Sequence, residues 1–245
     1  MYWFLLILFI ALILLTRWIT KHVQGIGYLV TGDGQIAMIL YFVLIFPGVL
    51  VHELSHAITA KLLRVRVRHL RIGIRRKGKS NQVALGSVDI AQTDPVRASL
   101  IGLAPLLVGC TAILLISDRV LGVHMLATFS PTSFWQEIKS MISVPDVGIW
   151  AYFVFALGNA MLPSSSDRQA WGPALILIVF VGALAYFSGL FDQVAGSLHA
   201  WVRTGTNRLT YAFAVTVAID LAFAIVLFVV EQTLALLGFG RLLYR

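Results

Sequence analysis

Long apolar segments separated by short polar stretches dominate this chain, and the pattern predicts helices that cross a membrane. A helix needs roughly 20 predominantly apolar residues to span a bilayer, with allowance for tilt and for half-buried ends. Six segments meet this description, at about residues 2–15, 36–60, 96–116, 147–162, 170–190 and 211–238. We therefore expect an all-α polytopic membrane protein, with residues 1–245 forming one domain.

One region departs from the helical pattern. After the second apolar segment, Arg64, Arg66 and Arg68 alternate with valines, which is the period of a β-strand. A polar turn at residues 76–81 separates this run from a second short β-like run at 82–90. The sequence predicts a small β-hairpin over about residues 63–90. Its edge strand is available to pair with an extended peptide.

The composition excludes an ordinary soluble domain. Hydrophobic residues make up 59% of the chain and charged residues only 12%, whereas about one quarter of a soluble domain is charged. The net charge is +8, and ten Lys and Arg residues lie between Lys61 and Arg97. If this segment faces the cytoplasm, thirteen Lys and Arg residues lie inside and six outside, as the positive-inside tendency favours. We expect the hairpin at the cytoplasmic face beside anionic lipid, and no nucleic-acid partner.

The second apolar segment contains the pentad His52-Glu53-Leu54-Ser55-His56. Ionisable groups are costly in hydrocarbon unless something pairs with them. Residues four apart share one helix face, so His52 and His56 can bind one metal ion while Glu53 acts as a general base on water. Because the single Cys110 lies in an apolar segment, a thiolate cluster is excluded. The pentad predicts one catalytic Zn²⁺ ion held by His and carboxylate.

A catalytic zinc site usually has three protein ligands, so one carboxylate is still required. Asp167 follows the fourth apolar segment, which breaks at Pro163 and ends on the cytoplasmic side, at the depth of the pentad. Glu231 on the last segment is the alternative, because it also falls in the inner half of the bilayer. Asp220 is expected nearer the outer half. Depth and the broken helix favour Asp167.

These residues resemble the site-2 protease family of intramembrane zinc metalloproteases. In that family an early span carries His-Glu-x-x-His, and a later span carries Asn and Pro followed by an Asp eight residues after the Asn, here Asn159, Pro163 and Asp167. The resemblance covers about residues 36–171, including the hairpin and the small-residue and proline pattern of residues 102–106. Where the family commonly has Leu and Gly beside the Asp, this chain has Ser166 and Arg168, and Arg168 is a competing partner for Asp167.

The resemblance implies an enzyme that hydrolyses peptide bonds in or near transmembrane segments of membrane proteins, in regulated proteolysis or in signal-peptide clearance. Its catalytic residues would be Glu53 and Asn159, with Asn159 holding substrate backbone or the developing oxyanion. The metal ligands would be His52, His56 and Asp167. Such an enzyme is expected in a prokaryotic plasma membrane, with membrane-protein substrates and lipid as partners and the active site toward the cytoplasmic half.

Two other classes of protein fit the same residues. One is a catalytically inactive zinc-binding membrane scaffold, which would hold client helices without cleaving them. The other is a small metal or proton transporter, with a polar path formed by His52, Glu53, His56, Asp220 and Glu231. The transporter is disfavoured, because the acidic residues are few and follow no inverted repeat.

Overall fold

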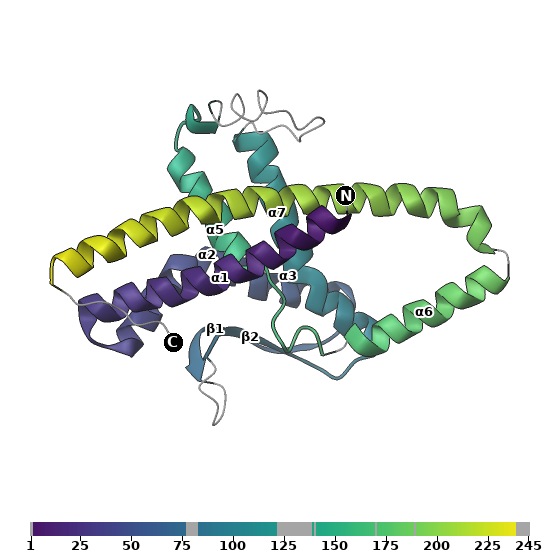
Figure 1. Ribbon diagram of the computed structural model, residues 1–245. Coiled ribbons are helices and arrows are strands. Elements are labelled where there is room, and N and C mark those ends of the chain that lie inside the picture. The colour runs from purple at the N-terminus through teal and green to yellow at the C-terminus, as the bar shows by residue number, and fades with distance from the viewer. Residues whose placement is uncertain are drawn as a thin grey trace.

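A computed structural model of the chain describes residues 2–76, 83–121, 139, 141–169, 171–188 and 190–238. This part of the chain is mostly helical, with six α-helices, one π-helix and a two-stranded antiparallel hairpin (Figure 1). In chain order the elements are α1 (Tyr2–Thr31), α2 (Gly34–Leu62), β1 (Val67–Arg76), β2 (Val83–Ile90), α3 (Pro95–Leu115), η1 (Ile116–Val120), α5 (Val147–Ala160), α6 (Trp171–Phe187) and α7 (Leu190–Leu236).

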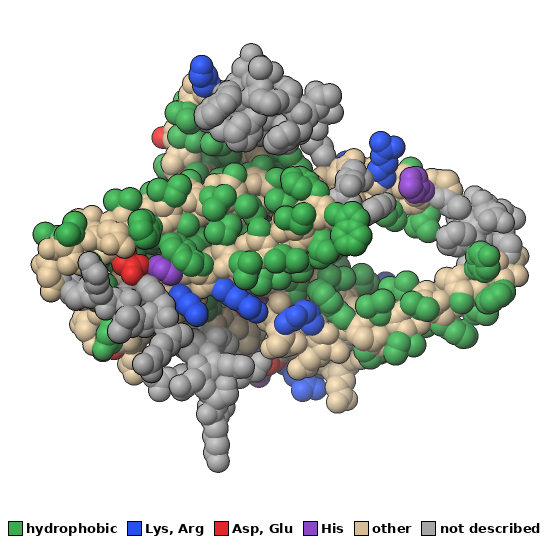
Figure 2. Space-filling view, viewed as in Figure 1, with side chains coloured by type: hydrophobic (Ala, Val, Ile, Leu, Met, Phe, Trp, Pro, Cys, Tyr) green, Lys and Arg blue, Asp and Glu red, His purple; other side chains and the backbone are tan. Residues whose placement is uncertain are grey.

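Four of these helical stretches are long and apolar enough to cross a membrane, at residues 3–31, 34–62, 95–119 and 198–236. Two shorter apolar helices, at residues 147–160 and 171–184, account for the other expected segments. The outer face over α1 and α7 is covered largely by hydrophobic side chains (Figure 2). These features confirm a multi-pass integral membrane protein, and they confirm the expectation of about six spans in part.

The first helix is longer than expected. The predicted end of the first span near residue 15 is wrong, because α1 continues to Thr31. Leu12, Ile19 and Val23 are buried and keep one apolar face directed into the protein, while Arg17 and Lys21 lie on the exposed side. The two cations therefore do not interrupt the helix. Gly32, with φ +68°, then provides the left-handed turn into α2.

The last expected span, 211–238, is part of one continuous helix of 47 residues, α7. Its C-terminal part lies beside α1 and runs in the same direction, since Phe9 stacks near Phe213 and His22 lies near Glu231 (Figure 1). Against α5 the direction is opposite, because Phe155 stacks on Phe223 while Gly158, further along α5, contacts Thr216, which precedes Phe223 in α7.

The predicted β-hairpin is confirmed. Strands β1 and β2 pair antiparallel, with Leu70 opposite Val88 and Ile72 opposite Gly86. The connection from α2 turns at Arg64, which has φ +59°, and Val65 N–H donates to the Ala60 carbonyl oxygen at 2.8 Å. This tight turn brings the hairpin back against α2, on the side that carries the pentad.

Candidate metal centre

Helix α2 carries both histidines of the pentad into the interior of the helix bundle. It packs against α1, α3 and α5. Gly48, one turn before the pentad, lies so close to the Ala156 carbonyl that a methyl group there would overlap it. Glu53 and His56 are buried, and His52 is partly buried. The close α2–α5 contact therefore places ionisable side chains where protein surrounds them.

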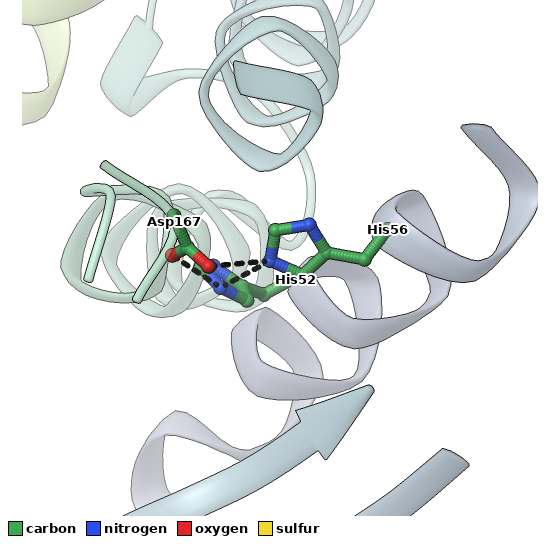
Figure 3. Close-up of side chains that lie close together, drawn as sticks. All are labelled: His52, His56 and Asp167. Carbon is green, nitrogen blue, oxygen red and sulfur yellow. Dashed lines mark hydrogen bonds and ion pairs between the residues drawn. The ribbon is translucent and has the colours of Figure 1, made fainter. Parts of the chain in front are cut away.

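The side chains of His52, His56 and Asp167 converge on one point (Figure 3). The two imidazole Nε2 atoms are 3.2 Å apart. Asp167 reaches them from the loop after α5, with Oδ1 at 3.3 Å from His56 Nε2 and Oδ2 at 3.7 Å from His52 Nε2. Residues more than one hundred positions apart in the sequence thus form one cluster.

A backbone carbonyl fixes the ring of His56. Its Nδ1 donates to the Ile101 carbonyl oxygen of α3 at 2.8 Å. Within a regular helix this carbonyl would accept from the N–H of residue 105, but residue 105 is proline, which has no N–H. Pro105 therefore leaves the Ile101 carbonyl available to the histidine.

The ring of His52 is fixed in a similar way at the end of α5. Its Nδ1 donates to the Ala160 carbonyl oxygen at 2.6 Å. The last carbonyls of a helix have no partner within the helix. Because α5 ends at Ala160 and Pro163 follows, that carbonyl is available to an external donor.

Asp167 is held by its own loop and by a glycine of α3. The backbone N–H of Ser164 donates to Asp167 Oδ2 at 2.7 Å. Gly102 lies so close to the Asp167 carbonyl oxygen that a Cβ atom would overlap it. Burial raises the pKa of the Asp167 carboxyl, and its hydrogen bonding to Ser164 lowers it. Arg168 does not compete here, since its Nε donates to the Ser164 carbonyl oxygen.

The three side chains fit a tetrahedral metal ion. Zinc binds imidazole nitrogen at about 2.0–2.1 Å, so two nitrogen ligands of a tetrahedron lie about 3.3 Å apart. The two Nε2 atoms here are 3.2 Å apart, and the Asp167 carboxylate has one oxygen 3.3 Å from His56 Nε2 and the other 3.7 Å from His52 Nε2. With each Nδ1 hydrogen donated to a carbonyl oxygen, both neutral rings present an Nε2 lone pair to each other and to a carboxylate. Three acceptors facing one another are stable when a cation lies between them. The group can therefore hold a metal ion.

Glu53 lies beside this group and outside it. Glu53 is 7% exposed, and its side chain packs against β2, where a Cβ atom at Gly86 would overlap the carboxylate. Strand β2 therefore covers the acid that follows His52. No feature of the sequence identified Gly86, because its contact with Glu53 depends on how the hairpin folds back.

The two alternative acids, Glu231 and Asp220, lie outside the His52–His56–Asp167 metal group. Glu231 Oε2 lies 3.7 Å from Nε2 of His22 in α1. Asp220 Oδ1 instead accepts from Asn159 Nδ2 at 3.0 Å, close to the end of α5 that holds His52. Because α7 runs opposite to α5, Asp220 lies nearer the metal group than Glu231 does.

Asn159 is brought near the metal group but makes contacts of its own. Its Nδ2 donates to the Phe155 carbonyl oxygen at 2.9 Å as well as to Asp220. Both amide hydrogens are thus used, while Oδ1 has no hydrogen-bond partner among the described residues. An acceptor can bind a substrate N–H but cannot stabilise an oxyanion. The expected role of Asn159 toward substrate stays a prediction.

Fold and site together define a multi-pass helical membrane protein with a His-His-Asp group that can hold a metal ion. Comparison of the chain with protein-family models, with curated proteins and with solved structures finds no match.

Proposed function

We propose that this protein is an intramembrane zinc metalloprotease, which hydrolyses peptide bonds in or near transmembrane segments of membrane-protein substrates. One observation carries the proposal: His52 and His56 Nε2 lie 3.2 Å apart, which is the separation of two ligands of a tetrahedral zinc ion, and both face the Asp167 carboxylate, with Glu53 next in sequence to His52. Three protein ligands leave one position open, which distinguishes catalytic from structural zinc sites.

The chain's own residues supply the proton transfers. Glu53 accepts a proton from the attacking water, whose oxygen bonds to the carbonyl carbon of the substrate. When the carbon–nitrogen bond breaks, Glu53 returns the proton to the leaving amine. Zinc, when bound, acts as a Lewis acid toward water and the scissile carbonyl. Burial of Glu53 beneath β2 keeps bulk solvent away from these transfers.

The substrate must reach this site as extended chain. In a helical transmembrane segment each peptide carbonyl is hydrogen-bonded and shielded by side chains, so the segment has to unwind locally before water attacks. We propose that Asn159 Oδ1, the free acceptor of its amide, binds a substrate backbone N–H. The enzyme would then act from the cytoplasmic half of a prokaryotic plasma membrane, in regulated proteolysis or in clearance of signal-peptide remnants.

The arrangement of the acids supports the transporter alternative less well than it supports the protease. A transporter requires Asp220 and Glu231 to continue a line of ionisable groups from the pentad. Asp220 is instead paired with Asn159, and Glu231 lies against α1 beside His22.

The test compares Glu53→Gln with the matched change Glu231→Gln. Each variant is co-expressed with a transmembrane reporter and purified to measure bound zinc. We expect Glu53→Gln to retain zinc and to lose reporter cleavage by about 10²–10⁴-fold, the usual contribution of a general base. Glu231→Gln should retain both zinc and cleavage.

A third variant, Asp167→Asn, should lower zinc occupancy because it removes a charged ligand. Retained cleavage by Glu53→Gln would refute the proposed mechanism. Zinc bound by the wild type without any cleavage of a panel of transmembrane reporters would instead identify the inactive scaffold.

A further inference from the structure

One buried acid in the membrane-spanning part has no role in the proposed chemistry. Asp220, on α7, is 0% exposed. Its Oδ1 accepts from Asn159 Nδ2, and Oδ2 has no hydrogen-bond partner within the part of the chain that the structure describes. An acid in such a position is costly, so its presence calls for a function.

The Asp220 carboxyl is connected to the metal group by a short series of contacts. Asn159, which it holds, also donates to the Phe155 carbonyl oxygen one turn earlier in α5. The next residue after Asn159 is Ala160, whose carbonyl oxygen accepts the hydrogen of His52 Nδ1 at 2.6 Å. Only the last turn of α5 therefore separates Asp220 from the partner of a metal ligand.

The same turn is packed closely from two sides. On α7, Thr216 contacts Gly158 so closely that a methyl group on the glycine would overlap it, and Phe155 stacks on Phe223 with ring centroids 4.1 Å apart. These apolar contacts fix how near α5 lies to α7. The hydrogen bond between Asn159 and Asp220 adds a directional constraint, because it sets the rotation of α5 about its axis.

We propose that Asp220 is a positioning residue for the metal centre. By holding Asn159, Asp220 fixes the last turn of α5 and keeps the Ala160 carbonyl oxygen in place to accept from His52 Nδ1. This inference rests on the metal ion of the proposed function, but it does not depend on peptide hydrolysis. Removing a partner that orients a metal ligand typically costs 10–100-fold in metal affinity. Because Asp220 acts through one further residue, the expected loss is about tenfold.

The test measures zinc affinity of the full-length protein in detergent, by competition with a chromophoric chelator. Asp220→Leu should weaken zinc binding about tenfold and change the visible spectrum of the Co²⁺-substituted protein. Asp220→Asn keeps an oxygen that can accept from Asn159, so its affinity should stay within about threefold of the wild type. The matched control is Thr216→Val, which removes a buried hydroxyl one turn away that donates only within α7. Its zinc affinity should not change.

A double-variant cycle tests whether the effect passes through Asn159. Asn159→Leu, Asp220→Leu and the combination should all bind zinc about tenfold more weakly, and the losses should not multiply. The combination also guards against misfolding, because replacing both hydrogen-bond partners with apolar groups of similar shape is nearly neutral for stability.

Three results would overturn the inference. The first is wild-type zinc affinity in Asp220→Leu or in the double variant. The second is losses that multiply in the cycle, since Asp220 and Asn159 would then act independently. The third is a wild type that binds no zinc, which would overturn the proposed function as well. Failure to cleave a reporter would affect only the proposed function.

Discussion

Replacing Pro105 with alanine should weaken zinc binding without destabilising the apo-protein. Pro105 leaves the Ile101 carbonyl oxygen free for His56 Nδ1, at 2.8 Å. An alanine at this position supplies an N–H that reaches the same carbonyl oxygen as an ordinary helical hydrogen bond. The substitution thus creates a competitor for His56 while it removes the usual penalty of a proline inside a helix.

The size of the expected loss in zinc affinity depends on the Ile101 carbonyl oxygen, which is the shared acceptor. A carbonyl oxygen has two lone pairs, so it can accept from the new backbone N–H and from His56 at once, with poorer geometry for each. The loss should therefore fall at the lower end of the 10–100-fold range for removal of a partner of a metal ligand, or about 1.4 kcal/mol for tenfold. The new backbone hydrogen bond contributes about 0.5–1.5 kcal/mol to the folded apo-protein, against a small cavity left by the proline ring.

The assay is chelator competition for zinc, paired with thermal unfolding of the zinc-free protein. Pro105→Ala should show weaker zinc binding with an unfolding temperature equal to or above that of the wild type. Pro47→Ala is the matched control, since it also removes a proline from the interior of a helix, and the carbonyl oxygen four residues before it, that of Val43, does not accept from either histidine. Zinc affinity of Pro105→Ala within twofold of the wild type would refute the idea that the proline frees a ligand partner.

Two glycines that contact the site give further predictions. Gly102→Ala places a methyl group against the Asp167 carbonyl oxygen, which belongs to the backbone and cannot rotate away. Zinc affinity should therefore fall tenfold or more in the same competition assay. Unchanged zinc binding would show that the Asp167 loop is not held by α3. Gly86→Ala places a methyl group against the flexible end of the Glu53 side chain. Reporter cleavage should therefore fall while zinc content stays at the wild-type level. A loss of zinc without a specific loss of cleavage would contradict this role for β2.

Much of the site could be predicted from the sequence because it depends on helix geometry. The spacing of His52 and His56 fixes both rings on one face of any α-helix, whatever surrounds it. Asp167 could be matched to the two histidines because Pro163 breaks the fourth apolar segment shortly before Asp167, at the depth expected for the pentad. The hairpin could also be predicted from the sequence, since alternating arginines and valines have the period of a strand.

The direction of the last span could not be predicted from charge. The topology expected from the sequence puts Arg203 and Arg208 outside, and Arg241 and Arg245 inside. Reversing the last span exchanges these two pairs of arginines. The numbers of Lys and Arg residues inside and outside therefore stay at thirteen and six. The contacts of Asp220 with Asn159 and of Glu231 with His22 fix the direction instead, and such contacts depend on helix packing that no local pattern encodes.

Both histidine rings are oriented by main-chain carbonyl oxygens, those of Ile101 and Ala160. Every amino acid carries this acceptor, so the identities of residues 101 and 160 are free to change as long as their size suits the packing. The orientation of the two rings depends instead on the positions where helical hydrogen bonding is interrupted, which are Pro105 and the end of α5. A mutational scan of this protein would therefore find tolerance at Ile101 and Ala160, whose carbonyl oxygens accept from the histidines, and intolerance at Pro105, which accepts from neither.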